Sequence, residues 1–156
     1  MAYMLKDSIG YRINLVATTM KTNFTKLLQP AYGVAAEQFA TLKIISEDHE
    51  VTQTQIAELL GKDKTTVGRS IDSLLKKGLL IREDLQSDKR ANRISLTPQA
   101  EQILKSAIPM AQKFNEAIKS KLTENEIETF FKVLDTILEK SKKVDINKGK
   151  IDEVIE

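Results

Sequence analysis

The chain has 156 residues, of which 41% are hydrophobic and 29% charged, and its formal net charge is +2. These values fit a helix-rich globular protein, and the small net charge by itself indicates no nucleic-acid partner. The sequence contains no cysteine, which excludes disulfides, thiol redox sensing and thiolate metal ligands. No apolar run approaches the roughly 18 residues of a membrane span and the first residues are unlike a signal peptide, so we expect a cytoplasmic protein.

The first predicted element is a long helix. Its apolar residues recur at steps of four and three and form one stripe: Ile9, Ile13, Val16, Met20, Phe24 and Leu27. Because Pro30 disfavours helix at the residue before it and Gly33 follows, this helix is expected to end near Gln29.

A second helix is predicted over residues 36–48, and a third, short helix begins after Thr52. Thr52 and Gln55 have the spacing of a capping box, in which each side chain bonds a free backbone amide of the first turn. Gly61 is expected to end the third helix. The apolar residues expected to face inward are Phe39, Leu42 and Ile45 on the second helix, and Ile56, Leu59 and Leu60 on the third.

A fourth helix and a hairpin complete the middle of the chain. Asp63 is expected to cap the helix, which runs to Lys77 and stops at Gly78. Two short strands are predicted over residues 79–84 and 92–97, joined by a polar loop. The third and fourth helices with the turn between them form a helix-turn-helix, and the hairpin follows it as a wing.

Two further helices are predicted after the hairpin. Thr97 before Pro98 is typical of a helix start, and Thr123 with Glu126 forms a second capping box. The predicted fold class is mainly α with a small β-hairpin, a winged helix-turn-helix flanked by long helices. The three predicted regions are residues 1–33, 34–97 and 98–156.

The fourth helix has two different faces. At 100° per residue, one face holds Val67, Ile71 and Leu74, and the opposite face holds Thr65, Arg69, Asp72 and Lys76. The first face is expected to pack and the second to meet solvent or a ligand. In a helix-turn-helix this second face enters the major groove of DNA, where Arg69 is suited to guanine and the first-turn hydroxyls to phosphate. The alternative is that Arg69 is an ordinary solvated side chain.

Positive charge is concentrated over the helix-turn-helix and the hairpin. The window 62–93 contains nine basic and five acidic residues, a net charge of +4, whereas the whole chain carries +2 and the remainder therefore −2. Attraction to a polyanion requires such a concentration. For Lys76 and Lys77 the sequence favours a solvated helix end that complements the helix dipole, with a phosphate contact as the alternative.

The residues that we expect to contact DNA lie on these two elements. They are Thr54, Lys62, Lys64, Thr65, Thr66, Arg69, Ser70, Lys89, Arg90 and Arg93. Lys89 and Arg90 at the hairpin tip are expected to enter a flanking minor groove, where negative potential is strong. Asp88 is expected to orient a wing arginine by a charge-assisted hydrogen bond. An ordinary polar turn is the alternative for this tip.

Two stretches resemble the MarR family of bacterial regulators. One is the run 63–81 with its Gly-Leu-Leu after the fourth helix, and the other is the run 87–97. The family's Asp-x-Arg wing motif with a downstream Leu-Thr is matched by Asp88, Arg90, Leu96 and Thr97. The flanking helices have the family's order and length, so the resemblance covers nearly the whole chain. Two departures are Lys89, where many members have arginine, and the absence of the cysteines that oxidation-sensing members use.

The resemblance implies a homodimer in which residues 1–33 and 98–156 form the dimerisation helices. It also implies double-stranded DNA as partner and a small aromatic or anionic effector, whose binding residues the sequence leaves unknown. The predicted function is a sequence-specific transcriptional repressor on an inverted-repeat operator. The alternative is a winged-helix protein-interaction module without specific DNA binding.

An enzyme is not expected, because the sequence offers no nucleophile–base pair and no glycine-rich phosphate loop. No cofactor or metal is expected either, since His49 is the only histidine and has no cysteine or second histidine to complete a metal site.

Overall fold

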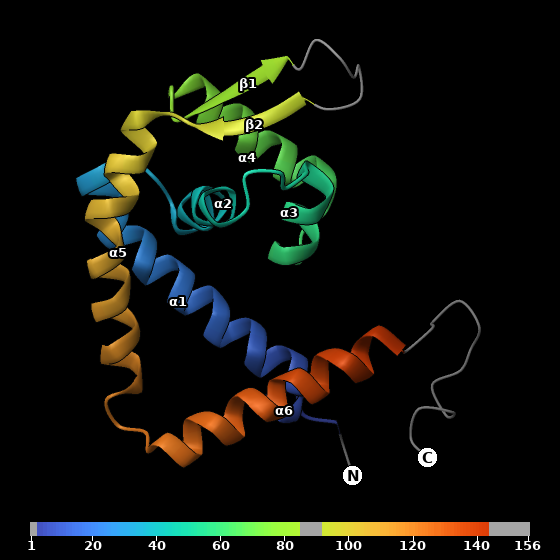
Figure 1. Cartoon of the computed structure of the whole chain (residues 1–156). Helices are drawn as coiled ribbons and strands as arrows, with labels where there is room; N and C mark the ends of the chain where they lie inside the picture. Colours follow the sequence, from blue (N-terminus) through green and yellow to red (C-terminus); the bar gives the residue numbers. More distant parts are fainter. Residues whose placement is uncertain (1–2, 85–91, 144–156) are drawn as a thin grey trace. The chain divides into compact units, whose positions relative to one another are not determined.

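The structure is a computed structural model that describes residues 3–84 and 92–143. The chain divides into two compact units, residues 1–112 and 113–156. Its elements follow in the order η1 (Leu5–Asp7), α1 (Ile9–Tyr32), α2 (Ala36–Glu47), α3 (Gln53–Leu60), α4 (Lys64–Lys76), β1 (Leu80–Asp84), β2 (Asn92–Leu96), α5 (Pro98–Lys119) and α6 (Glu124–Lys143) (Figure 1). This order confirms the predicted fold class, mainly α with one β-hairpin.

Helix α1 is longer than the sequence predicted. It continues through Pro30 to Tyr32, so the expected end near Gln29 is wrong. Proline has a helix-compatible φ and removes only one backbone donor, whereas Gly33 adopts the left-handed φ of 68° that ends a helix. The Tyr32 hydroxyl then donates to the backbone oxygen of Ser106 (3.1 Å), which bonds the last turn of α1 to α5.

Helix α2 begins at two alanines, whose side chains cannot cap it. The backbone amide of Ala35 donates instead to Oε1 of Gln38 (3.2 Å), and that of Ala36 donates to the hydroxyl of Thr25 on α1 (3.0 Å). One free amide is thus satisfied by the third residue of α2 and the next by a neighbouring helix.

The predicted caps of α3 and α4 are confirmed. Thr52 accepts from the amide of Gln55 (3.2 Å), and the Gln55 side chain accepts from the amide of Thr52 (2.8 Å). Gly61 ends α3 with a φ of 61°, and Asp63 accepts from the amide of Thr66 (2.8 Å) at the start of α4. These local bonds set the length of the turn between the two helices.

The hairpin and the start of α5 meet at Thr97. The strands are antiparallel, with Leu80 opposite Leu96. The Thr97 hydroxyl donates to the backbone oxygen of Gly78 (2.8 Å) and accepts from the amide of Ala100 (3.3 Å). One side chain therefore closes the base of the wing and caps α5, as the Thr97–Pro98 pair predicted.

The hydrophobic core belongs to the first unit and draws on every helix and strand around α2. Its fully buried large residues include Leu28, Leu42, Ile45, Ile56, Ile71 and Leu74. Leu59, which was expected to face inward, is 67% exposed. It lies about 110° around α3 from the mean direction of the two buried residues, Ile56 and Ala57, so an eight-residue helix that buries those two turns Leu59 to solvent.

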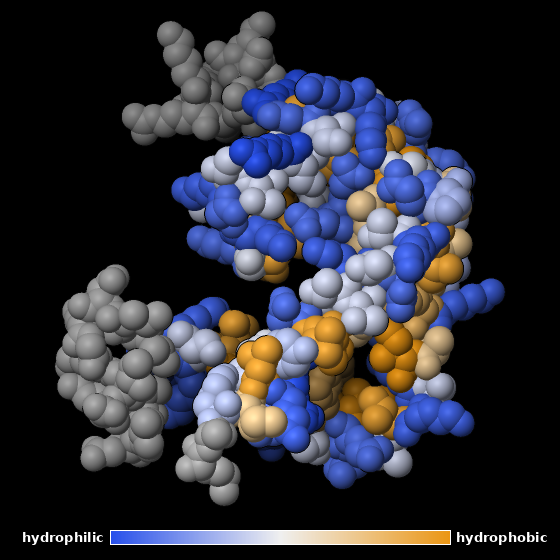
Figure 2. All heavy atoms as spheres, turned by 180° about the vertical axis from the view of Figure 1, so that it is seen from behind, coloured by the Kyte–Doolittle hydropathy of each residue, from blue (hydrophilic) through white to orange (hydrophobic). Residues whose placement is uncertain are grey.

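Many apolar side chains outside this core are exposed. Only Leu28 of α1 is buried, and α6 buries no residue among those described. The exposed large apolar residues of these two helices are Ile9, Tyr11, Ile13, Leu15, Val16, Leu27, Phe130, Phe131, Val133 and Leu138. Figure 2 shows such side chains in orange, whereas the winged-helix part in its upper half is covered mainly in blue. None of the helices in the described part is both long and apolar enough to cross a membrane.

Candidate nucleic-acid interface

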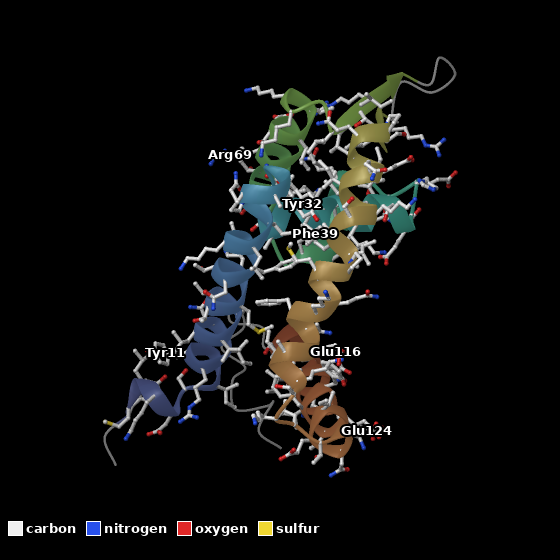
Figure 3. The ribbon with its side chains drawn as sticks, turned by 90° about the vertical axis from the view of Figure 1, so that its left-hand side faces the viewer. Tyr11, Tyr32, Phe39, Arg69, Glu116 and Glu124 are labelled. Carbon is white, nitrogen blue, oxygen red and sulfur yellow. The ribbon has the colours of Figure 1, made fainter. Side chains whose placement is uncertain are left out.

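The outward face of α4 is the centre of the candidate interface. Its four residues, Thr65, Arg69, Asp72 and Lys76, are exposed, and the three on the opposite face, Val67, Ile71 and Leu74, have no exposed surface. The predicted division of the helix into two faces is therefore confirmed. Arg69 projects away from the body of the fold (Figure 3). Within the described ranges no carboxylate pairs with it, so its guanidinium donors are available to a ligand.

The first turn of α4 divides its hydroxyls between two roles. The Thr66 hydroxyl donates to the second oxygen of Asp63 (2.6 Å), so it serves the helix cap. This bond, and then the one from the Thr66 amide, holds the pKa of Asp63 below its ordinary value. Thr65 is exposed at the same turn, and its hydroxyl lies where helix N-termini bind phosphate.

Helices α3 and α4 approach each other closely at Gly68. A Cβ added there would lie 2.9 Å from Nε2 of Gln53, and that amide donates to the backbone oxygen of Lys64 (3.1 Å). The missing side chain therefore makes room for a bond between the first turns of the two helices. Sequence reasoning missed both residues, since a glycine inside a helix shows its reason only when the neighbouring helix is in place.

The wing is bonded to the body of the unit through both of its strands. On β1, Arg82 pairs with Asp72 of α4 (3.2 Å), and on β2, Nε of Arg93 donates to the backbone oxygen of His49 (3.2 Å). Arg93, a predicted DNA contact, is half-buried, and this bond anchors β2 near the end of the strand pair that lies away from the wing base. Asp72 occupies the outward face of α4 but is directed to the wing.

The remaining predicted contacts on the helix-turn-helix fall into two groups. Lys64 is exposed, and Lys62, also exposed, lies 3.9 Å from the carboxylate of Glu37 on α2. Thr54 and Ser70 are half-buried, and the Ser70 hydroxyl oxygen is itself buried without a hydrogen-bond partner in the described part. The structure thus brings the two lysines to the surface near Thr65 and turns Ser70 toward the body of the fold.

The predicted wing-tip residues Asp88, Lys89 and Arg90 lie outside the described residues. Their contacts with a minor groove stay a prediction from the sequence. His49 lies in the turn between α2 and α3, and among the described residues no group of three or more histidine or acidic side chains is placed to hold a metal ion.

Comparison with known proteins gives one family. A family model described as the MarR family matches residues 32–91, which span the last residue of α1 to the wing. The fold is also that of a MarR/EmrR family transcriptional regulator from an Acinetobacter species, with a TM-score of 0.85 and 19% identity over 91% of this chain and 100% of the other.

Two further solved structures share the fold at similar identity. MepR of S. aureus, solved as a complex with DNA, has a TM-score of 0.73 and 22% identity over 86% of this chain and 96% of its own. CouR of Rhodococcus jostii, bound to p-coumaroyl-CoA, has a TM-score of 0.73 and 20% identity over 87% of this chain and 95% of its own. The MarR family model thus matches the winged-helix region of this chain, and the solved structures share the fold over most of its length.

Proposed function

We propose that this protein is a sequence-specific DNA-binding transcriptional regulator, a repressor that acts in the cytoplasm as a homodimer on an inverted-repeat operator. The observation that carries the proposal is the exposed Arg69, which has no carboxylate partner in the described ranges and lies one turn into α4. In a helix-turn-helix, the N-terminal residues of the second helix reach the base edges. A guanidinium at this place can donate to both acceptors of a guanine, which discriminates against other bases by about 1–3 kcal/mol.

The charges around Arg69 support a polyanionic ligand. Lys62, Lys64 and Lys76 are exposed on the same helix-turn-helix, and the acidic Asp72 is paired with Arg82. Backbone phosphates supply the attraction that is independent of sequence, so lysines at this rim favour docking while Arg69 reads a base.

A homodimer accounts for the apolar side chains that one chain leaves exposed on α1 and α6. Exposed apolar surface on a helix of this kind marks a protein interface. A two-fold axis between the copies would present two α4 helices to successive major grooves about 34 Å apart. The DNA complex of MepR supports this use of the fold, and it is a property of that protein.

Release from DNA by a small aromatic or anionic effector completes the proposal. CouR was solved with p-coumaroyl-CoA, and PcaV of Streptomyces coelicolor with its natural ligand. p-Coumaroyl-CoA is aromatic and anionic and belongs to a protein of 20% identity to this chain, so it supports the class of effector and not a particular compound. The ligand of PcaV, a protein of 18% identity, supports only the use of this fold to hold a ligand.

Substitution of Arg69 tests the proposal. We expect Arg69→Ala to cost about 1–3 kcal/mol of binding to the operator and to relax the preference at one base pair. Lys76→Ala is the matched control, because Lys76 lies on the same face two turns further from the reading end. Gel-shift titrations against the operator and a scrambled duplex measure both variants.

Two outcomes would contradict the proposal. If Arg69→Ala keeps the wild-type ratio of operator to scrambled binding, Arg69 is not the base reader. If the wild-type protein binds no duplex from its own promoter region, the chain is a protein-interaction winged helix instead.

A further inference from the structure

The C-terminal end of α4 is bonded to the junction between α1 and α2. The ammonium group of Lys77 donates to the backbone oxygen of Gly33 (2.7 Å) and to Oε1 of Gln38 (3.0 Å). Gln38 donates in turn through Nε2 to the hydroxyl of Ser73, one turn earlier on α4 (3.1 Å). We call these four residues the Lys77 bridge. It joins the C-terminal part of α4 to the end of α1 and the first turn of α2, which lie 35 to 44 positions earlier in the chain.

The partners of Lys77 suit a cation. Gly33 is the C-cap of α1, where backbone oxygens have no intrahelical donor and carry the negative end of the helix dipole. Oε1 of Gln38 also accepts from the amide of Ala35, so the amide group is held in one orientation while it accepts from Lys77. Lys77 is exposed, as the sequence favoured, and the structure adds its two hydrogen bonds to Gly33 and Gln38.

The apolar contacts of α4 do not by themselves fix its orientation, which directional bonds can do. Val67, Ile71 and Leu74 bury one face, but hydrophobic burial is not directional and holds a helix against a core without fixing its rotation or tilt closely. Hydrogen bonds are directional. On the flank that carries Ser73 and Lys77, the hydroxyl of Ser70 has no partner among described residues, so the bridge supplies the directional contacts there.

We propose that Lys77 is a positioning residue that fixes the angle of α4 relative to α1, and so sets the half-site spacing that the dimer accepts. The inference rests on the proposed function, because it assumes that α1 helps to join two copies and that α4 reads DNA. α1 runs from Gly33 back to the exposed apolar segment assigned to the dimer. A fixed angle at Gly33 therefore sets the separation of the two reading helices.

The neighbouring Lys76 is a matched control. It carries the same charge one residue earlier, it is exposed, and no hydrogen bond or ion pair joins it to another described residue. A general loss of attraction to phosphate would affect the two lysines alike, whereas a loss of position would affect Lys77 alone.

The experiment compares Lys77→Met, Lys76→Met and Lys77→Arg on the operator and on duplexes with one base pair added or removed between the half-sites. We expect wild type to prefer the native spacing at least tenfold, and Lys77→Met to reduce this preference at least threefold. Lys76→Met should weaken binding to all duplexes alike, and Lys77→Arg should retain the preference because it keeps the donors. An unchanged preference in Lys77→Met, or an equal loss in Lys76→Met, would overturn the proposal.

A second measurement needs no DNA. Thermal unfolding of the full chain at one protein concentration is compared for Lys77→Met, Gln38→Leu and the double variant. Because the two side chains bond each other, the midpoint shift of the double variant should be smaller than the sum of the single shifts. Additive shifts would overturn the bridge whatever the protein binds. Non-additive shifts in a protein that binds no duplex would support the bridge and reject the proposed function.

Discussion

Helices α4 and α6 are both amphipathic, but they differ in how far their apolar faces are buried. Both carry apolar residues on one face and charged residues on the other. On α4 this face has no exposed surface, whereas on α6 Phe131 is 53% exposed and no described residue is buried. Periodicity therefore shows which face of a helix is apolar and not what covers it. The body of the first unit covers α4, and we infer that a second copy covers α6.

The largest effect is expected from the buried face of α4. Ile71→Ala should cost about 2–5 kcal/mol of the free energy of unfolding, since it removes a fully buried side chain and leaves a cavity. Urea unfolding at fixed protein concentration measures this, with Lys76→Ala as an exposed control that should shift stability by no more than about 0.5 kcal/mol. A cost below about 1 kcal/mol for Ile71→Ala would mean that α4 does not depend on this core.

The apolar face of α6 should respond differently. Phe130 and Phe131 contact each other with ring centroids 6.1 Å apart, and both are half exposed. Replacing both by serine should raise the dimer dissociation constant at least about tenfold, because a buried aromatic ring contributes about 1.5–3 kcal/mol. Sedimentation equilibrium measures the constant, with Glu128→Gln on the same helix as control. Unchanged self-association of the double variant, or a wild-type protein that is monomeric at micromolar concentration, would show that α6 does not form the dimer interface.

The caps of α3 and α4 allow a comparison by pH. Thr52 and Gln55 do not titrate in acid, whereas the pKa of Asp63 is lowered below 3.8 by its bonds to Thr66. A carboxyl group whose pKa is lowered by folding stabilises the folded state at pH values above its unfolded-state pKa. This stabilisation is lost as the pH falls through its folded-state pKa. Asp63→Asn keeps an acceptor without the charge.

We therefore expect the unfolding midpoint of wild type to exceed that of Asp63→Asn near neutral pH, and the difference to shrink between about pH 5 and pH 2. Circular dichroism across this range measures it. Glu126, whose pKa is lowered by the Thr123 amide and hydroxyl, is present in both proteins and cancels from the comparison. A difference that stays constant in acid would show that the Asp63 charge does not contribute.

The smallest effect is expected at Ser70. Its hydroxyl oxygen is buried and has no hydrogen-bond partner in the part of the chain described. Ser70→Ala should leave stability unchanged or raise it by less than about 1 kcal/mol, because the buried group is lost without breaking a bond. Operator affinity should stay within about twofold in the same gel-shift assay. A fivefold loss of affinity would restore Ser70 as the DNA contact that the sequence suggested.

Local signals allowed most of the fold to be predicted. Thr52, Asp63, Thr97 and Thr123 each cap a helix through a residue three positions on, so their effect is contained in a short stretch of sequence. The exposure of Arg69 followed from the helical period in the same way. The end of α1 was not predicted correctly, because Pro30 and Gly33 both favour a helix end. The helix ends at Gly33, which adopts the left-handed φ, and not at Pro30.

The contacts that position the site were not predicted, because they join residues far apart in the chain. Gln53 meets Lys64, Arg93 meets His49, and Lys77 meets Gly33 across 44 positions. Each pairs a long polar side chain with a backbone oxygen, and any of many exposed lysines or arginines has the same appearance in sequence. Only the packing of the helices and the wing against one another shows which one is bonded.

Selection of bound sequences from random DNA tests whether two copies present Arg69 to successive major grooves. We expect an inverted repeat with half-site centres about 10 base pairs apart, and loss of one preferred guanine in each half-site when Arg69→Ala is selected in parallel. Recovery of no enriched sequence, or of a single unrepeated site that is the same for both proteins, would contradict it.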